Sequence, residues 1–83
     1  MSDPITITVY SRENCHLCAE AKETIQRVSE ETGTPIELSE IDVDTDEALR
    51  ERYGERVPYV MIEGRPAYKY RVDEADLRDR FDR

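Results

Sequence analysis

The sequence predicts an α/β fold of order β-α-β-α-β-β-α, with a four-stranded mixed sheet flanked by helices. Three observations support this prediction. Residues 5–10 alternate apolar and polar side chains, an apolar stripe with helical spacing runs through residues 18–28, and a short glycine-containing connection follows residue 62. The chain has 83 residues, a length that fits one domain. We therefore expect a single domain over residues 1–83.

The first half of the chain reads as strand, helix and strand. In ITITVY, residues 5–10, β-branched side chains recur with a period of two, which is typical of a strand. A helix is expected from about Cys15 to Thr32, because Gly33 follows as a helix stop. PIELSEI, residues 35–41, is the second strand. Strands joined through a helix are normally parallel neighbours, so these two should pair in parallel.

A turn and a short helix are expected in DVDTDEALRERYG, residues 42–54. Asp44 or Thr45 can cap this helix, because short polar side chains accept hydrogen bonds from the free N–H groups of a first turn. Gly54 is expected to end it.

The last third of the chain predicts a hairpin and a helix. Residues 59–63 and 66–70 read as two strands, and their short connection places Gly64 at a position of positive φ. The final helix follows Asp73, the expected N-cap. This hairpin adds an antiparallel pair to the sheet, which makes the sheet mixed.

The composition is strongly acidic. Twelve basic residues stand against twenty acidic ones, and the formal net charge is -8. Nucleic acids and anionic membrane surfaces require basic patches, so neither is expected as a partner. Only Lys22 and Lys69 are lysines. At molar salt the Debye length falls to about 3 Å, and an acidic surface then no longer repels itself, so we expect a halophilic protein.

The N-terminus carries no sign of secretion. MSDPITITVY lacks a basic stretch followed by an apolar run, so it does not resemble a signal peptide. No segment reaches the length of a membrane span. We expect a soluble, cytoplasmic monomer. Structural disulfides are rare in that compartment, and a cysteine pair there more often serves catalysis or metal binding.

Both cysteines lie at the start of the first helix. Cys18 opens a stripe with Ala21, Ile25 and Val28, whose steps of three and four define one helical face. Cys18 should therefore be shielded against the sheet. Cys15 lies one turn earlier, at the exposed tip of the helix. The two residues are i and i+3 and close enough to bond.

This placement suits disulfide exchange. Free N–H groups and the positive end of the helix dipole stabilise a thiolate at Cys15, and the thiolate is the attacking species. Cys15 would attack a substrate disulfide, and Cys18 would then displace the product. Arg12 and His16 could add positive charge near the sulfur. Equally, each could be an ordinary solvated polar residue.

Other uses of the cysteines stay open. A structural zinc site needs four ligands, whereas this chain offers two thiols and His16. A metal would have to be shared between two chains. The cysteines could also be inert and buried, or serve a redox sensor without turnover. The alternative to an enzyme is therefore a metal-binding or redox-sensing module.

The chain resembles the glutaredoxin-like branch of the thioredoxin superfamily over nearly its whole length. The resemblance rests on YSRENCHLC, on CHLCAEAKETI, on the later VPYV and on the order of elements. It implies a cis Val57–Pro58 bond facing the cysteines and a Val57 backbone that pairs with an extended substrate. It also implies that Arg12 helps to bind a glutathione carboxylate. Tyr59 is expected either to line the groove or to pack elsewhere.

The resemblance implies a thiol–disulfide oxidoreductase without a bound cofactor or metal. Its electrons would come from glutathione or a similar small thiol, or from a thioredoxin-reductase-type flavoprotein. Its substrates would be protein disulfides or low-molecular-weight disulfides. Two features depart from the classical pattern: His16 and Leu17 replace Pro-Tyr, and YRVDEAD, residues 70–76, replaces a Gly-Gly step. Because of the second departure, a protein reductase is a rival to glutathione as the electron donor.

Overall fold

The computed structural model describes residues 3–82, so residues 1–2 and 83 of the predicted domain lie outside the described part. The observed element order is the predicted one. None of the helices in this range has the length and apolar composition needed to cross a membrane. The elements are β1 (Ile5–Ser11), α1 (His16–Thr32), β2 (Ile36–Asp42), the 3-10 turn η1 (Val43–Thr45), α2 (Glu47–Tyr53), β3 (Tyr59–Ile62), β4 (Arg65–Lys69) and α3 (Glu74–Phe81).

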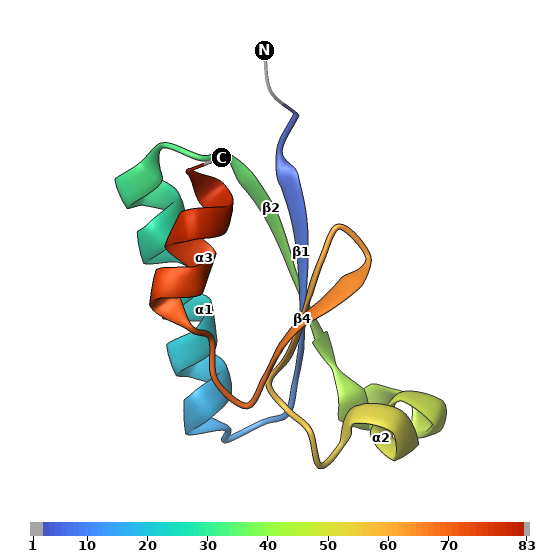
Figure 1. The fold of residues 1–83 in the computed structure, drawn as a ribbon. Coiled ribbons are helices and arrows are strands. Elements are labelled where there is room, and N and C mark those ends of the chain that lie inside the picture. Colours follow the sequence, from blue (N-terminus) through green and yellow to red (C-terminus); the bar gives the residue numbers. More distant parts are fainter. Residues whose placement is uncertain (1–2, 83) are drawn as a thin grey trace.

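The four strands form one mixed sheet in the order β2-β1-β3-β4. β1 and β2 run parallel, as expected for strands joined through α1. β3 pairs antiparallel with both β1 and β4, and the register shifts between Val60 and Met61. The carboxyl end of β1 and the start of β3 therefore lie at the same end of the sheet, where α1 begins (Figure 1).

Helices α1 and α3 lie side by side and cover one face of the sheet (Figure 1). The core forms between these helices and the sheet, because the apolar stripe of α1 and alternate residues of β1 and β3 face each other. α2 meets the opposite face at its edge, where the Tyr53 ring stacks on Tyr10 at 4.4 Å between centroids. The core cluster consists of Ile7, Val9, Ile25, Val28, Val60, Leu77 and Phe81.

Helix α1 ends as its sequence predicts. Gly33 adopts a left-handed conformation with φ 67°, and its N–H donates to the Glu30 carbonyl over 3.3 Å. The N–H of Thr34 donates to the Ser29 carbonyl over 3.0 Å. These bonds satisfy carbonyls that a helix end leaves without intrahelical partners.

The predicted cap of α2 is wrong. Asp46 caps this helix, and its carboxylate accepts the Ala48 N–H over 2.8 Å. Asp44 and Thr45 belong instead to η1, where the Asp44 N–H donates to the Asp42 carboxylate over 2.9 Å. The Thr45 hydroxyl also donates to the Asp42 carbonyl, over 2.7 Å. Both residues are thus used by the turn one step before the helix, while Gly54 ends α2 as predicted.

The hairpin and the last helix follow the predictions closely. Gly64 has φ 78°, in the region that glycine adopts without steric cost. Arg65 pairs with Ile62, and Ile62 pairs with Ile7 near the start of β1, so the hairpin turn points away from the start of α1. Asp73 caps α3 by accepting the Asp76 N–H over 3.1 Å.

Candidate active site

The two cysteines lie where the chain leaves β1 and enters α1. Cys15 is the N-cap of α1, with extended backbone angles of φ -101° and ψ 105°, and Cys18 lies in the first turn. Their Cα atoms are 5.2 Å apart, and their sulfurs form a disulfide. The predicted bond between residues i and i+3 is confirmed.

The two sulfur environments differ, largely as predicted. Cys18 is 2% exposed and shares the buried stripe of α1 with Ala21, Ile25 and Val28. Cys15, however, is half-buried rather than fully exposed. The disulfide bond to the buried Cys18 holds the Cys15 side chain against the first turn of α1. Cys15 is therefore the more accessible of the two cysteines, and Cys18 is covered.

The Cys15 sulfur accepts a hydrogen bond from the backbone. The Cys18 N–H donates to it over 3.1 Å, so the sulfur takes the place that an oxygen occupies in an ordinary N-cap. First-turn N–H groups have no intrahelical partner and carry the positive end of the helix dipole. The same donor would stabilise a negative charge on this sulfur after reduction.

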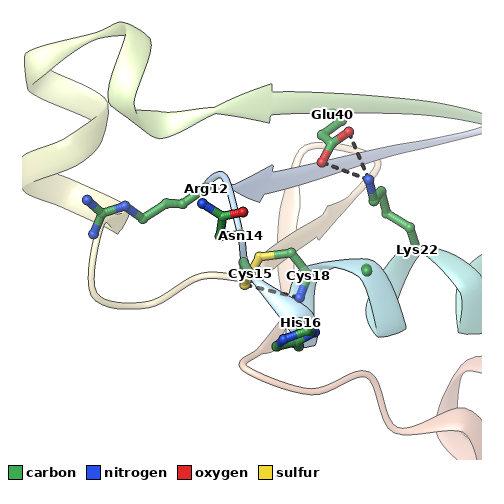
Figure 2. A pocket seen from close by; sticks show the side chains of 8 residues that line it. Arg12, Asn14, Cys15, His16, Cys18, Lys22 and Glu40 are labelled. Carbon is green, nitrogen blue, oxygen red and sulfur yellow. Dashed lines mark hydrogen bonds and ion pairs between the residues drawn. A yellow bond between two sulfur atoms is a disulfide. The ribbon is translucent and has the colours of Figure 1, made fainter.

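A pocket of about 290 Å³ opens beside the disulfide (Figure 2). It receives side chains from the β1–α1 loop, from the first two turns of α1 and from β2. Polar and charged groups therefore surround the sulfurs on the side that faces β2. The lining residues are Arg12, Asn14, Cys15, His16, Cys18, Ala19, Lys22 and Glu40.

Lys22 and Glu40 form an ion pair in this pocket that the sequence did not lead us to predict. The Lys22 Nζ atom lies 2.9 Å from a Glu40 carboxylate oxygen, and Figure 2 shows the two side chains meeting between α1 and β2. The buried Ser11 hydroxyl also donates to Glu40, over 2.8 Å. Hydrogen bonds from Lys22 and Ser11 lower the pKa of the Glu40 carboxyl. The available signal was Lys22 itself, four residues after Cys18.

Arg12 lines the pocket, but its charged group is turned away from the sulfurs. Its Nε atom lies 3.0 Å from the Asp44 carboxylate, and its guanidinium donates to the Gly54 carbonyl over 3.3 Å. Figure 2 shows the side chain extending away from the disulfide. The end of α2 itself requires glycine at position 54, because a Cβ atom there would lie 2.5 Å from the Arg50 carbonyl oxygen.

The structure separates three further residues that the sequence predicted for the site: His16, Val57 and Pro58. His16 is exposed, begins α1 and lines the cysteine pocket. The Val57–Pro58 bond is cis, which confirms the expectation drawn from the family resemblance. Pro58 is buried, and its carbonyl accepts the Tyr70 N–H over 2.8 Å. Neither Val57 nor Pro58 lines the cysteine pocket.

Tyr59 lies apart from the cysteine pocket. Its ring centroid is 4.9 Å from that of Tyr53 and 6.4 Å from that of Tyr10, on the sheet face opposite α1. It also lines a separate groove of about 310 Å³ along β4. The structure therefore supports packing for Tyr59, the second of its two expected roles. Within residues 3–82, no three His, Cys, Asp or Glu side chains are grouped so that they could hold a metal ion.

The chain is similar in sequence or in fold to known proteins. Residues 6–82 match the glutaredoxin-like domain family (DUF836). An uncharacterized protein of Mycobacterium tuberculosis is 32% identical over 83 residues, which cover 94% of this chain and 82% of the relative. A protein of Nitrosomonas europaea, solved in solution, superimposes with a TM-score of 0.78 at 29% identity and covers 98% of this chain and 94% of its own.

A more distant solved structure has a similar fold. The germline-specific thioredoxin Deadhead of Drosophila melanogaster superimposes with a TM-score of 0.58 at 24% identity, covering 95% of this chain and 79% of its own. That likeness concerns the fold alone. The match over residues 6–82 leads to one conclusion: the chain belongs to the glutaredoxin-like domain family (DUF836), its fold is thioredoxin-like, and its CxxC pair is Cys15 and Cys18.

Proposed function

We propose that this protein is a dithiol–disulfide oxidoreductase. The observation that carries the proposal is the unequal environment of two bonded sulfurs. The Cys15 sulfur accepts a backbone N–H at the start of α1 and Cys15 is half-buried, whereas Cys18 is 2% exposed. A nucleophile that is accessible and stabilised as a thiolate, followed by a shielded second thiol, suits sequential disulfide exchange.

The reaction begins with both cysteines reduced. The Cys15 thiolate attacks one sulfur of a substrate disulfide, forms a mixed disulfide and releases the other substrate sulfur as a thiolate. Cys18 then loses its proton and attacks the Cys15 sulfur. This second step releases the remaining substrate thiolate and forms the Cys15–Cys18 disulfide. Two electrons pass from the protein to the substrate, and the substrate thiolates take up protons from solvent at a pH below their pKa values.

The neighbouring residues have proposed roles in this scheme. The Val57 backbone, next to the cis bond to Pro58, would pair with an extended substrate segment. His16 lines the pocket and would contact the group attached to the attacked sulfur. Arg12 would contribute only if its guanidinium left Asp44, because that ion pair holds it at 3.0 Å. Tyr59 would support the Val57–Pro58 segment, which we call the substrate loop, by packing on Tyr53.

The oxidised pair must be reduced again, and we propose that a protein reductase supplies the electrons. A small thiol such as glutathione would need hydrogen-bond donors for its carboxylates. At the start of α3, however, the Asp73 carboxylate already accepts the Asp76 N–H over 3.1 Å. This cap places a carboxylate where a second carboxylate would be repelled. A thioredoxin-reductase-type flavoprotein does not depend on such a site.

A reduction assay in molar KCl tests the function and the donor together. The oxidised protein is incubated with reduced glutathione in one tube and with a thioredoxin-reductase system in another, and thiol release is followed. A Cys18→Ser protein serves as the control, because it cannot form the internal disulfide. Reduction by the reductase alone supports the proposal as stated, while fast reduction by glutathione would keep the function but change the donor.

Two other results would count against the function itself. A protein that neither system reduces would not turn over as an oxidoreductase. If that protein also releases a chelatable metal in a ratio of one ion per two chains, the cysteines are ligands shared by a dimer. Turnover with either donor would exclude the alternative that the protein is only a metal-binding module.

A further inference from the structure

The basic residues of this acidic chain are unevenly distributed. Residues 50–71 contain six basic and three acidic residues, a net charge of +3. The remainder contains six basic and seventeen acidic residues, a net charge of -11. The segment of positive charge begins in α2, passes through Val57–Pro58 and ends just after β4. Positive charge is thus concentrated in the part of the chain that surrounds the proposed substrate loop.

Among the described residues, the same segment holds the basic groups that lack a carboxylate partner. Two of them lie over neighbouring rings, Arg52 over Tyr53 at 5.6 Å and Lys69 over Tyr70 at 5.3 Å. Within residues 3–82, five basic side chains lie within 4.0 Å of a carboxylate, and all five are outside residues 50–71. Five of the six that are not paired in this way form what we call the basic rim, and all five are exposed. The basic rim consists of Arg50, Arg52, Arg56, Lys69 and Arg71.

The basic rim lies on both sides of Val57–Pro58. Arg56 is two residues before Pro58, and Lys69 is paired in the sheet with Tyr59, directly after it. The Tyr70 N–H, between Lys69 and Arg71 in sequence, donates to the Pro58 carbonyl over 2.8 Å. α2, the loop before β3 and the loop after β4 lie at the end of the molecule where α1 begins (Figure 1).

Two surface pockets along the basic rim share one lining residue, Arg56. Arg56 lines a pocket of about 440 Å³ at the end of α2, together with Arg50, Arg52 and Arg12. It also lines the groove of about 310 Å³ along β4, together with Lys69. The charged surface therefore continues past the substrate loop from one side to the other. Such an extent suits a macromolecular surface better than a small ligand.

Local effects explain only part of this arrangement. Arg50 and Arg52 lie in the last turn of α2, where cations interact favourably with the helix dipole. That effect does not reach Arg56, Lys69 or Arg71, which are outside the helix. Glu51 and Glu55 line the same pocket as Arg50 and Arg56, yet neither lies within 4.0 Å of them. The basic rim remains available to an external partner.

We propose that the basic rim is a docking surface for the acidic surface of a partner protein that exchanges disulfides with Cys15. The proposal rests on the proposed function, since it assigns the partner of that same site. Carboxylates on the partner would contact the guanidinium groups while its disulfide approaches from the Val57–Pro58 side. Opposite charges would speed the encounter, and the acidic remainder of the chain would repel the partner in other orientations.

Charged model substrates test the docking surface. Three peptides of equal length each carry one intramolecular disulfide, flanked by glutamates, by glutamines or by lysines. The rate constant for oxidation of the reduced protein is measured with each peptide at low ionic strength and in molar KCl. Flanking charges also alter the reactivity of a disulfide toward any thiolate, so each rate is divided by the rate of the same peptide with dithiothreitol, a small dithiol that reacts as a thiolate but has no basic surface.

We expect the glutamate peptide to react about tenfold faster than the lysine peptide at low salt, after this correction. Molar KCl should abolish the difference. The variant R50Q/R52Q/R56Q should lose most of the preference and keep its rate with the glutamine peptide. R65Q is the matched control, because Arg65 has no carboxylate within 4.0 Å and lies at the far end of β4; it should behave as the wild type.

Equal corrected rates, or a faster lysine peptide, would overturn the docking proposal while leaving the oxidoreductase intact. Millimolar pyrophosphate that slows all three peptides equally, in the absence of a charge preference, would assign the arginines to a phosphate-bearing ligand and also overturn it. If no peptide is reduced although dithiothreitol reduces all three, the proposed function fails first, and the docking proposal fails with it. Because wild-type rates and their salt dependence decide the first outcome, a variant that fails to fold does not block the test.

Discussion

The backbone N–H of Cys18 donates a hydrogen bond to the sulfur of Cys15, and this 3.1 Å contact links the two halves of the CxxC pair. Cys18 therefore has two roles: its backbone N–H donates to the Cys15 sulfur, and its side chain carries the second sulfur of the pair. Because a backbone donor is independent of the side chain, replacing Cys18 should leave the environment of Cys15 largely unchanged.

Replacing each cysteine by serine should therefore give opposite results. C18S keeps the Cys15 nucleophile but cannot resolve the first exchange, so it should accumulate a mixed disulfide with a substrate peptide. C15S should trap almost nothing, because the remaining thiol is 2% exposed. Intact-protein mass spectrometry measures the adducts. Equal trapping by both variants would contradict the assigned order of attack.

The Lys22–Glu40 pair should set the reduction potential. Lys22→Gln leaves a carboxylate near the sulfurs without its cation, so the reduced thiolate form becomes less favourable and the potential more negative. Glu40→Gln leaves the ammonium unpaired and should shift the potential the other way. We expect shifts on the order of 10 mV, since about 30 mV corresponds to a tenfold change in the equilibrium constant.

Equilibration with a dithiothreitol redox buffer measures both potentials. Lys69→Gln is a suitable control, because Lys69 is the other lysine of the chain and does not line the cysteine pocket. Shifts of the same sign in Lys22→Gln and Glu40→Gln would show that the pair acts through packing rather than charge.

Potassium chloride should stabilise the protein. The net charge of -8 on 83 residues creates repulsion that salt screens. Salt also weakens surface ion pairs such as Arg78–Glu31 at 2.9 Å, but exposed pairs contribute little to stability. We therefore expect the Tm to rise between about 0.1 M and about 2 M KCl. A flat or falling Tm would argue against adaptation to high salt.

The cap of α3 should be needed for stability. Asp73→Ala removes the carboxylate that accepts the Asp76 N–H, at a cost of about 1 kcal/mol in the free energy of unfolding. Urea unfolding followed by circular dichroism measures the loss. Glu23→Ala, an exposed change on α1, should alter the free energy much less.

Acid should weaken the contact between α1 and α3. Hydrogen bonds from Arg27 and then Arg78 lower the pKa of Glu74 below its ordinary 4.5. A carboxyl group whose pKa is lower in the folded than in the unfolded state stabilises the protein at pH values above its unfolded-state pKa. This stabilisation is lost as the pH falls through the folded-state pKa. The wild type should therefore lose more Tm than Glu74→Gln between about pH 5 and about pH 3. Parallel Tm curves would contradict this role for Glu74.

Periodic features of the chain could be predicted because their signal is local. The steps from Cys18 to Ala21, Ile25 and Val28 place these residues on one face, and all four are buried. Gly64 has the predicted positive φ because the hairpin turn requires it. The cis bond before Pro58 was expected from the family resemblance, whereas the fraction of cis bonds before proline in general would have favoured trans.

The pairing of distant charges was not predictable in the same way. Lys22 meets Glu40 only because β2 pairs with β1 in a register that places Glu40 opposite Val9. Arg12 meets Asp44 because η1 inserts a turn before α2. Asp42, Asp44, Thr45 and Asp46 are all competent caps, and the choice among them depends on where that turn closes. Each of these outcomes depends on three-dimensional placement that local propensity does not determine.

The uneven distribution of charge also bears on the distance over which a partner would be recognised. Residues 50–71 carry a net charge of +3 in a chain whose net charge is -8. At about 0.1 M salt the Debye length is roughly 10 Å, so the basic rim would attract an acidic neighbour only at close range. The range of recognition would then depend on the salt content of the surroundings.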